Sequence, residues 1–363
     1  MARSNALESP SLAIAGVTGA VGQEFLAVLA ERGFPIGGLK LLASARSAGR
    51  EVSFGGRTHV IEELKEDSFE GVDLALFSAG GGVSERFAPL AVDAGCTVVD
   101  NSSAFRMTEG VPLVVPEVNP EAIAAAGIGL GAEDKPGILA NPNCSTILML
   151  VVAHPLHAAA GVTRIVASTY QAASGGGAAA MSELEQQTRE SLGEAGGREV
   201  RTKAVFGRTY AFNLFSHNSP MQPNGYNQEE LKMVHETHKI WGQDRLPDAE
   251  RTGVTATCIR VPVMRAHAES LNLSFGRDLH EDEARSLLAS APGVRVVDDR
   301  ASGSFPTPLD ASGTDPVQVG RIRRDLSQPA GRGIDLFLCG DQIRKGAALN
   351  AVQIAELVLR SAG

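Results

Sequence analysis

The chain has 363 residues, of which 43% are hydrophobic and 21% are charged, and its formal net charge is −9. This composition is ordinary for a globular protein, and the length exceeds what one hydrophobic core usually organises, so we expect two domains. A membrane or nucleic-acid function is excluded, because no apolar run approaches the roughly 20 residues that span a bilayer and no run of Lys or Arg offers a basic surface.

Residues 1–10 lack a long apolar stretch and do not resemble a signal peptide, so we expect a cytoplasmic location. The four cysteines lack the paired spacing of a disulfide framework or a zinc site, and no metal is expected. Cys96, Cys258 and Cys339 lie in or beside apolar strand-like runs, as buried thiols do. Only Cys144 lies in polar, turn-like surroundings.

Residues 11–142 repeat a rhythm of strand and helix. The short apolar runs SLAIAG, LKLLAS, DLALFSA and TVVDNS each end in small or polar residues, and a helical stretch at 83–94 separates the last two. Such alternation predicts a parallel sheet that is covered by helices.

A glycine-rich turn follows the first of these runs. Its glycines permit a tight turn and a close approach of the backbone, and the helix that follows offers unpaired N–H groups to a phosphate. The turn has the form GxxGxxG, a variant of the dinucleotide fingerprint, although glycine-rich turns also occur for packing reasons. The segment is Gly16-Val17-Thr18-Gly19-Ala20-Val21-Gly22.

The second run carries a signal for the choice of cofactor. An NAD site usually places an acidic residue at the end of this strand, where it binds the ribose 2′-hydroxyl. Here the run ends LLASARSAGR, and no carboxylate is present. Ser44, Arg46 and Ser47 instead offer a cation and two hydroxyls, which a 2′-phosphate requires, so the sequence favours NADP. The alternative is a solvated loop in which the arginine has no such role.

Cys144 follows Asn141-Pro142-Asn143 and precedes the apolar run ILMLVVA. Asn143 is a good helix N-cap, which places Cys144 in the first turn, where the helix dipole favours the reactive thiolate. This position predicts a nucleophile, because a structural cysteine more often lies within the apolar run.

Beyond Cys144 the pattern becomes that of a mixed α+β domain. The segment ESLNLSFG alternates with period two, and VTRIVASTY, TATCIRVPV and DPVQVGRIRRD are further strand candidates. Helices are expected at 145–154, 178–193, 227–241 and 281–290, and Pro155 should end or kink the first. The last stretch, GIDLFLCGDQIRKGAALNAVQIAELVLR, predicts a strand and a long helix that could complete either domain.

A cysteine that performs acyl transfer needs a partner that manages protons. His267 is the best candidate, because the segment from Arg260 to His267 places a cation and an imidazole at the end of an apolar strand. His217 is a weaker candidate. The alternative for His267 is a turn histidine without a catalytic role.

Together these residues resemble the aspartate-semialdehyde dehydrogenase family. The similarity extends over nearly the whole chain, and the order and number of the motifs make it specific; Val17 stands where the family usually has alanine. The motifs are GVTGAVG at 16–22, ASARSAG at 43–49, FSAGG at 77–81, NSSAFRM at 101–107, VPEVN at 115–119, NPNCST at 141–146, QAASGGG at 171–177, EELKM at 229–233, RVPVMRAHAES at 260–270 and DQIRKGAALNAVQIAE at 341–356.

The resemblance implies a role for each site residue. Cys144 is the acylated nucleophile, Gln171 positions it and the acyl group, and His267 is the acid/base. Phosphate contacts fall on Arg106, Asn143 and Lys232; Arg260 pairs with the substrate α-carboxylate, and Glu229 lies near the substrate amino group. The cofactor contacts are Gly16, Thr18, Gly19, Ala20, Val21, Ser44, Arg46, Ser47, Ser174, Gly175 and Gln342.

The resemblance also implies the domains and the reaction. We expect a Rossmann-type NADP-binding domain at 1–143 and 341–363, to which the final strand and helix return. A catalytic and dimerisation domain at 144–340 would have a mixed, largely antiparallel sheet and would build a homodimer. The reaction expected is NADPH-dependent reduction of 4-phospho-L-aspartate to L-aspartate 4-semialdehyde. The alternatives are an N-acetyl-glutamyl-phosphate reductase and a catalytically silent NADP-binding sensor.

Overall fold

The structure, a computed structural model, describes residues 8–193 and 200–360. The chain divides into two compact units, of which unit 1 comprises residues 1–143 and 347–363, and unit 2 comprises residues 144–346. Residues 1–7 and 361–363, which the sequence analysis assigns to the first domain, lie outside the described residues.

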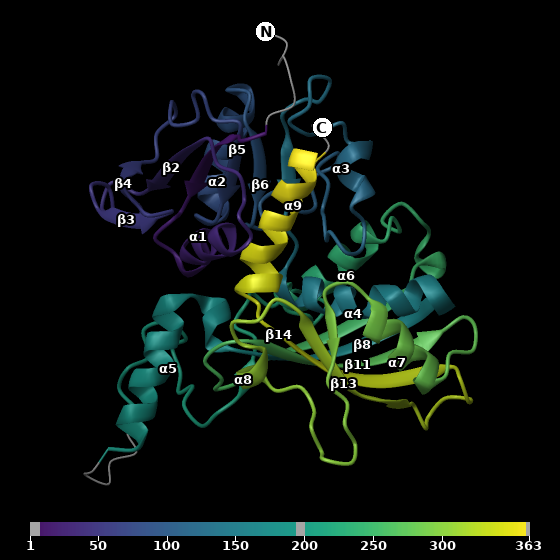
Figure 1. The fold of residues 1–363 in the computed structure, drawn as a ribbon. Coiled ribbons are helices and arrows are strands. Elements are labelled where there is room, and N and C mark those ends of the chain that lie inside the picture. Colours follow the sequence, from purple (N-terminus) through teal and green to yellow (C-terminus); the bar gives the residue numbers. More distant parts are fainter. Residues whose placement is uncertain (1–7, 194–199, 361–363) are drawn as a thin grey trace. The chain divides into compact units, whose positions relative to one another are not determined.

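Within the described part of unit 1 the strands form one seven-stranded sheet in the order β3-β4-β2-β1-β5-β6-β7 (Figure 1). All neighbours run parallel except β3 and β4, which form an antiparallel pair at one edge. The strands are β1 (Ser11–Ala15), β2 (Gly38–Ala43), β3 (Glu51–Phe54), β4 (Arg57–Glu63), β5 (Leu74–Phe77), β6 (Thr97–Asp100) and β7 (Ile138–Ala140). The helices of this unit are α1 (Ala20–Glu31), α2 (Gly81–Asp93), α3 (Glu121–Ala125) and α9 (Leu349–Arg360).

The parallel strands β1, β5 and β6 in this sheet are buried on both faces, as a parallel sheet requires. Successive residues of β1 enter different cores, because side chains alternate between the faces of a strand. Leu12 and Ile14 belong to a core with residues of α1 and α9, and Ala13 and Ala15 belong to another with residues of α2. The expected Rossmann-type architecture is confirmed. The glycine-rich turn directly follows β1, at the carboxyl end of the sheet.

Unit 2 contains a second seven-stranded sheet among its described residues, in the order β12-β13-β14-β11-β8-β10-β9. Its pairings are antiparallel except those of β12 with β13 and of β8 with β10, which confirms the mixed, largely antiparallel sheet. The strands are β8 (Val162–Gln171), β9 (Phe215–Ser216), β10 (Gly253–Arg260), β11 (His267–Phe275), β12 (Val294–Val296), β13 (Val317–Arg324) and β14 (Gly333–Gly340). The α-helices are α4 (Cys144–Ala160), α5 (Ala178–Ser191), α6 (Gln228–Ile240), α7 (Glu281–Ser290) and α8 (Pro308–Ala311). The shorter helical turns are η1 (Ala173–Gly176) and η2 (Asp248–Glu250).

The expected helices of unit 2 appear as α4, α5, α6 and α7, but the expected end of the first at Pro155 is wrong. Helix α4 continues through Pro155 to Ala160. Proline removes one backbone hydrogen bond from a helix, but most residues of α4 are buried against the sheet, and this packing offsets the loss.

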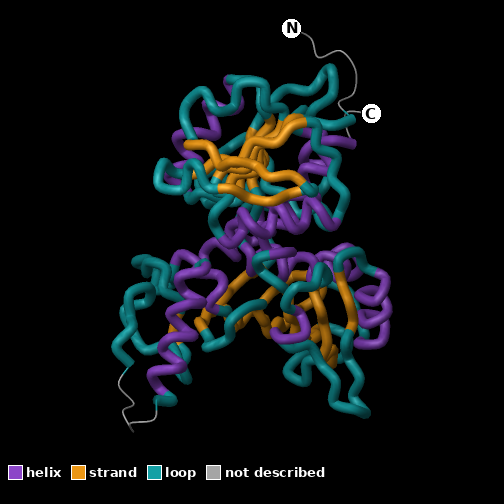
Figure 2. Tube along the Cα trace, turned by 60° about the vertical axis from the view of Figure 1, so that its left-hand side comes forward, coloured by secondary structure: helices purple, strands orange, loops and turns teal. Residues whose placement is uncertain are grey.

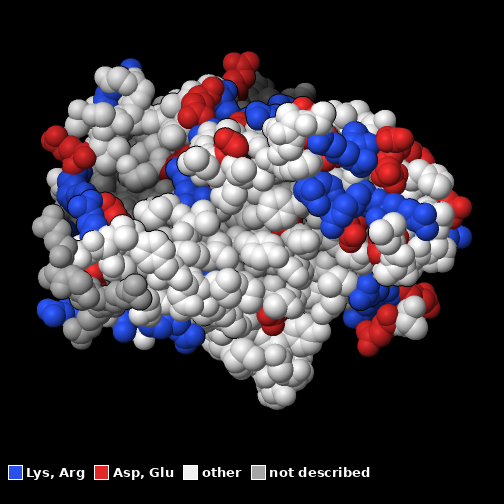
Figure 3. Space-filling model, turned by 90° about the horizontal axis from the view of Figure 1, so that it is seen from below, with Lys and Arg blue, Asp and Glu red and all other residues white. Residues whose placement is uncertain are grey.

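Helices α4, α6 and α7 pack on one face of the second sheet (Figures 1 and 2). The other face leaves side chains such as Tyr170, which is 40% exposed, and the half-buried Phe337 at the surface. Seen from below, the chain presents a broad central area with few charged side chains (Figure 3).

The end of the chain divides between the units. Strand β14 pairs with β11 and β13 in unit 2, whereas α9 belongs to unit 1. The expectation that the strand returns to the first domain is therefore wrong, because its buried apolar face completes the second sheet. The π-helical turn η3 (Arg344–Ala348) carries the chain across this boundary. Among the described residues, no helix is long and apolar enough to cross a membrane.

Candidate active site

The glycine-rich turn lies between β1 and α1. Gly16 has φ +88°, and a Cβ there would lie 2.5 Å from the carbonyl oxygen of Ser78, so only glycine fits. A Cβ on Gly22 would lie 2.3 Å from the oxygen of Gly16, which explains the close approach of the helix to the turn. Gly19 caps α1 without a side-chain hydrogen bond, and this leaves a helix N-terminus suited to an anionic group.

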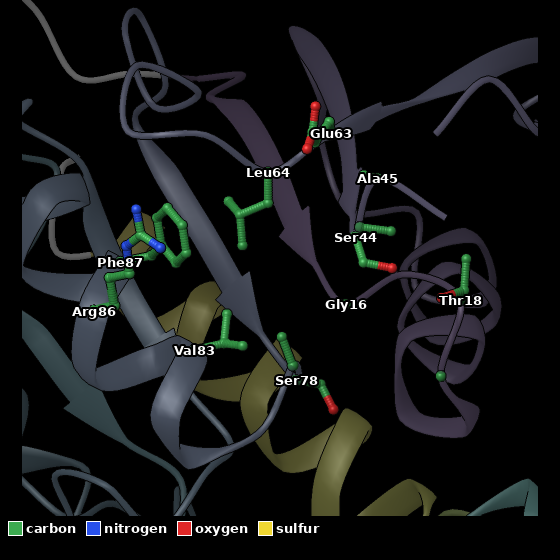
Figure 4. Close-up of a pocket in the computed structure, with 13 residues that line it drawn as sticks. Gly16, Thr18, Ser44, Ala45, Glu63, Leu64, Ser78, Val83, Arg86 and Phe87 are labelled. Atoms are coloured by element: carbon green, nitrogen blue, oxygen red, sulfur yellow. The ribbon is translucent and has the colours of Figure 1, made fainter. Parts of the chain in front are cut away.

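A cavity of about 460 Å³ opens beside this turn (Figure 4). Its size falls within the roughly 300–1,000 Å³ of small-molecule sites. The lining comes from the ends of β1, β2, β4 and β5 and from α2, all in unit 1: Gly16, Thr18, Gly19, Ala43, Ser44, Ala45, Glu63, Leu64, Ser78, Ala79, Val83, Arg86 and Phe87.

The residues predicted to bind the cofactor in unit 1 are only partly gathered in this cavity. Ser44 lines the cavity. Arg46, two residues further along the chain, is exposed and does not line the cavity. Ser47 is buried, and its N–H donates to the carbonyl of Ser44 at 2.8 Å, so the turn after β2 is tightly closed. Ala20 and Val21 begin α1 behind the glycine turn.

Cys144 is the first residue of α4, and its side chain is partly exposed. The turn η3 approaches it closely, because a Cβ on Gly346 would lie 2.8 Å from the Cβ of Cys144. The thiol therefore lies at a helix N-terminus, where the helix dipole favours an anion. Cys96, Cys258 and Cys339 are buried, and burial raises the pKa of Cys339 to about 12, so that thiol stays protonated at neutral pH.

Gln171, at the end of β8, connects the start of α4 to α6. Its Nε2 donates to Ser145 Oγ at 2.7 Å and to Glu229 Oε1 at 3.2 Å. The amide is almost fully buried, and its Oε1 has no hydrogen-bond partner among the described residues. The amide is thus fixed against Ser145, the residue that follows Cys144, and its Oε1 can accept a further hydrogen bond.

Glu229 and Lys232 lie one turn apart on α6. Lys232 Nζ donates to Glu229 Oε2 at 3.1 Å, and the carboxylate is 7% exposed while the lysine side chain is 26% exposed. Asn227 caps the helix through a capping box with Glu230, which fixes the first turn that carries Glu229. A buried carboxylate with a cation beside it can meet a second positive group.

Arg260 ends β10 and is 5% exposed. Its Nε donates to Asn218 Oδ1 at 3.2 Å and its Nη1 to the carbonyl of Ala172 at 3.1 Å. The guanidinium carbon lies 5.8 Å from the ring centroid of Phe206. These contacts orient the guanidinium and leave N–H groups for an anion.

His267 begins β11 and is fully buried. The Ala172 N–H donates to its Nδ1 at 3.1 Å, so the neutral ring carries its proton on Nε2. Nε2 has no hydrogen-bond partner among the described residues. It lies beside Gly175, where a Cβ would be 3.1 Å from it and 2.9 Å from Arg260 Nη1. Glycine at 175 therefore keeps the space next to the imidazole and the guanidinium open.

Burial, with the nearby Arg260 charge, lowers the pKa of His267 well below its ordinary value. His217, the weaker candidate, is also near these groups, and burial lowers its pKa to about 4 against the opposing charge of Glu229. Its Nδ1 accepts from the N–H of Ser219 at 3.2 Å. Both imidazoles are therefore neutral near neutral pH. The backbone of Ala172 bonds both to His267, through its N–H, and to Arg260, through its carbonyl oxygen.

The two remaining substrate-binding candidates belong to unit 1. Arg106 is 8% exposed, and its guanidinium donates to the backbone oxygens of Asn141 at 2.9 Å and Asn101 at 3.1 Å. These anchors fix the orientation of the cation. Asn143 is buried and directly precedes Cys144 in the chain.

The predicted cofactor contacts in unit 2 form their own pair. Gln342 Nε2 donates to Ser174 Oγ, and both side chains are buried. Ser174 and Gly175 belong to the 3₁₀ turn η1, and the N–H of Ser174 donates to Met264 O at 3.0 Å.

The sequence analysis missed three residues that hold the site. Ser145 accepts from Gln171, and Asn218 accepts from Arg260. Tyr210 is fully buried, and its hydroxyl donates at 2.5 Å to the carbonyl oxygen of Val261, the residue that follows Arg260. Ser145 follows Cys144 and could have been noticed, but Asn218 and Tyr210 carry no local signal.

Two protein-family models match the chain, and both describe semialdehyde dehydrogenases. The family model for the NAD binding domain of semialdehyde dehydrogenases matches residues 11–126, and the model for their dimerisation domain matches residues 154–345. The chain thus has the two domains of a semialdehyde dehydrogenase, with a nucleotide-binding domain at its start.

Similar proteins narrow the class. An aspartate-semialdehyde dehydrogenase of Synechocystis sp. is 51% identical over 96% of this chain and 97% of its own length. Another, of Bacillus subtilis, is 44% identical over 95% and 96%. The crystal structure of aspartate semialdehyde dehydrogenase II from Vibrio cholerae, complexed with ASA, matches with a TM-score of 0.89 and 42% identity over 98% of this chain and 99% of that one. The chain belongs to the aspartate-semialdehyde dehydrogenase family.

Proposed function

We propose that this protein reduces 4-phospho-L-aspartate to L-aspartate 4-semialdehyde and phosphate with NADPH, through a thioester on Cys144, in the route to lysine, threonine and methionine. The observation that carries the proposal is the position of Cys144 at the start of α4, with the buried amide of Gln171 bonded to the adjacent Ser145. The relatives are named for the same semialdehyde.

The chemistry begins with the sulfur. The thiolate of Cys144 attacks the acyl carbon, a C–S bond forms, and the C–O bond to phosphate breaks. Phosphate leaves with the electron pair and takes up one proton. The bound dinucleotide supplies the hydride that reduces the thioester carbon. When the C–S bond breaks, the aldehyde leaves and Cys144 is a thiolate again.

His267 acts at the oxygen of the reacting carbonyl. Its Nε2 proton faces the space beside Gly175, and no other described group accepts it. A donor fixed in a buried site stabilises the negative charge that develops on oxygen when sulfur or hydride adds. The same nitrogen serves as the acid/base when the oxygen gains or loses a proton.

Charged groups recognise the substrate. Arg260 offers its remaining N–H groups to the α-carboxylate, for which a planar guanidinium is well suited. Glu229 is the partner of the substrate ammonium, and Lys232 beside it contributes to phosphate binding. Arg106 and Asn143 are the phosphate contacts that unit 1 carries.

NADP is the cofactor that these residues favour. The glycine turn and the uncapped start of α1 fit a pyrophosphate, since Gly16 and Gly22 leave no room for side chains. Arg46 and the hydroxyls of Ser44 and Ser47 follow β2 at the place where a 2′-phosphate needs partners. Within unit 2, Ser174, Gly175 and Gln342 complete the proposed cofactor contacts.

The protein is a homodimer in this proposal. The face of the second sheet opposite α4, α6 and α7 carries a shallow depression lined by apolar and aromatic residues such as Tyr170, Val263 and Phe337. Apolar surface of this kind is typical of an interface. The family model that matches this unit describes a dimerisation domain.

One assay tests the function. The purified protein is given NADP, phosphate and either L-aspartate 4-semialdehyde or N-acetyl-L-glutamate semialdehyde, and nicotinamide absorbance is followed. We expect turnover with the first aldehyde, because Glu229 can pair with a free ammonium but not with an acylated nitrogen. Turnover with the second alone would indicate an N-acetyl-glutamyl-phosphate reductase, and binding of NADP without any turnover would indicate a sensor.

A further inference from the structure

A buried carboxylate, Asp341, lies beside the proposed acid/base and has no role in the proposed function. Asp341 directly follows β14, whose last residue, Gly340, pairs with His267 at the start of β11. The side chain of Asp341 is fully buried. A carboxylate in such a place is costly unless its oxygens receive hydrogen bonds, so the bonds that Asp341 accepts indicate what it holds together.

The two oxygens of Asp341 accept hydrogen bonds from different parts of unit 2. Oδ1 accepts from the backbone N–H groups of Ile343 at 3.0 Å and Arg344 at 3.2 Å. Oδ2 accepts from Nε of Arg265 at 2.7 Å and from the N–H of Gly313 at 2.6 Å. Oδ1 therefore closes the turn that leads into η3, and Oδ2 ties this turn to Arg265 and to the loop after α8.

The turn that Asp341 closes borders the proposed nucleophile. The N–H of Gly346 donates to the backbone oxygen of Asp341 at 3.2 Å, and a Cβ on Gly346 would lie 2.8 Å from the Cβ of Cys144. Gln342, the next residue, donates from its amide to Ser174. Asp341 thus determines the path of a backbone that lies against Cys144.

On its other side, Asp341 holds the segment that leads to His267. Ala266, between Arg265 and His267, is fully buried and has φ +69°, a conformation that residues with a side chain rarely adopt. Such a backbone persists where its surroundings fix it. The ion pair of Arg265 with Asp341 is one such restraint, directly before the strand that carries the imidazole.

We propose that Asp341 is a positioning residue for the reaction: paired with Arg265, it fixes the spacing between Cys144 and His267. In the proposed function the thiolate and the imidazole act on the same carbonyl group. An error in their spacing therefore slows the chemistry more than it weakens substrate binding. This inference rests on the proposed function.

The main test is Asp341→Asn. The amide oxygen can still accept from the N–H groups that close the turn, but the amide nitrogen cannot accept from Arg265. Because an error of about 1 Å between reacting groups can cost about a hundredfold, kcat should fall roughly ten- to a hundredfold. KM for L-aspartate 4-semialdehyde should stay within about twofold, since Arg260 and Glu229 keep their places. Steady-state kinetics measure both quantities.

Variants of Arg265 test the other partner. Arg265→Met should reproduce the loss in kcat, while the carboxylate of Asp341 keeps its backbone N–H bonds. Arg265→Lys should keep kcat within about fivefold of wild type, because an ammonium can still meet the carboxylate. Arg265→Met combined with Asp341→Asn should lose little more than either alone, because both remove the same bond.

Asp315→Asn is the matched control. Asp315 pairs with Arg344 of the same turn at 2.6 Å, but its side chain is 43% exposed, and Arg344 is remote in sequence from the segment before His267. An exposed ion pair contributes little, so kcat should change by less than about twofold.

Alkylation of Cys144 measures the same restraint without turnover. Peptide mass spectrometry follows its reaction with bulky N-ethylmaleimide and with the smaller iodoacetamide. Because the turn lies against Cys144, its release in Asp341→Asn should raise the ratio of the two rates severalfold, whereas Asp315→Asn should leave the ratio unchanged. The other cysteines, which are buried, should stay unmodified, and this excludes general unfolding.

Four outcomes overturn the inference: an unchanged kcat in Asp341→Asn, an equal loss in Asp315→Asn, a rise in KM as large as the fall in kcat, or an unchanged alkylation ratio in Asp341→Asn. Arg265→Met, at the partly exposed end of the pair, decides if Asp341→Asn does not fold. If wild-type protein shows no turnover with the semialdehyde, the proposed function is wrong, and the alkylation ratio alone decides whether Asp341 fixes the turn at Cys144.

Discussion

The candidate sites of the two units are built by different means. In unit 1 the cavity is formed by close backbone approach at Gly16, and side chains such as Thr18 and Ser44 are exposed. In unit 2 the functional side chains are themselves buried: Gln171 is 1% exposed and His267 is fully buried. Burying a polar group is costly unless it is hydrogen-bonded, so these side chains are fixed by partners.

This difference has a consequence for mutation. We expect that substitution of an exposed side chain in the cavity of unit 1 removes one contact to the proposed ligand and leaves the fold unchanged. A substitution in the buried cluster of unit 2 also leaves its partners unsatisfied, and it disturbs the geometry that chemistry requires. We therefore expect large effects on kcat in unit 2 and moderate effects on affinity in unit 1.

The largest effect is expected for Cys144→Ala. Loss of the nucleophile should lower kcat by about ten thousandfold or more, because no other group can form the thioester. Affinity for NADPH should change by less than about twofold, a shift too small to represent a lost hydrogen bond. Cys339→Ala is the matched control, since that thiol is buried and protonated, and it should retain activity. Stopped-flow kinetics and NADPH titration measure both quantities, and activity in the Cys144 variant would refute the assignment.

His267→Asn should lower kcat by roughly two to four orders of magnitude with a much smaller change in KM. The pKa of His267 is lowered well below 6.5, so the ring is already neutral near neutral pH and gains a proton only in more acidic solution. Activity of the wild type should therefore show no loss from this group as pH falls from roughly 8 to 6.5. An unchanged kcat in the variant would make His217 the better candidate for the acid/base.

Arg260→Lys tests substrate binding in the buried cluster. A lysine cannot contact Asn218 and Ala172 and also bind both carboxylate oxygens, so KM for the semialdehyde should rise roughly ten- to a hundredfold. Arg106→Ala should chiefly raise the KM for phosphate. Steady-state kinetics with each substrate varied would show whether the two assignments must be exchanged.

The smallest effect is expected in unit 1. Arg46→Ala should reduce the preference for NADP over NAD by roughly tenfold, because a charge-assisted bond at an exposed site is lost. Arg86→Ala is the comparison, since Arg86 lines the cavity on α2, and it should weaken both dinucleotides equally. If Arg46→Ala instead weakens both to the same extent, the arginine has only a general electrostatic role.

The sequence predicted those parts of the molecule that local patterns determine. The glycine turn and the start of α4 follow from spacing within a few residues of Gly16 or Cys144, and the parallel sheet follows from the alternation of strands and helices over residues 11–142. Tertiary packing decided the rest. Helix α4 passes Pro155 because it is buried, and β14 joins the second sheet because it pairs there with both β11 and β13.

The supporting contacts of the site could not be predicted in the same way. Gln171 meets Ser145 across 26 residues and Glu229 across 58, and neither partner is marked by spacing.

Trapping the acyl-enzyme tests the thioester on Cys144 most directly. The protein is incubated with 4-phospho-L-aspartate without NADPH, quenched in acid and examined by intact-mass and peptide mass spectrometry. The account predicts one aspartyl group per chain, located on the peptide with Cys144 and lost when NADPH is added before the quench. An aspartyl group on Cys96, Cys258 or Cys339, or turnover without any acylated Cys144, would contradict it.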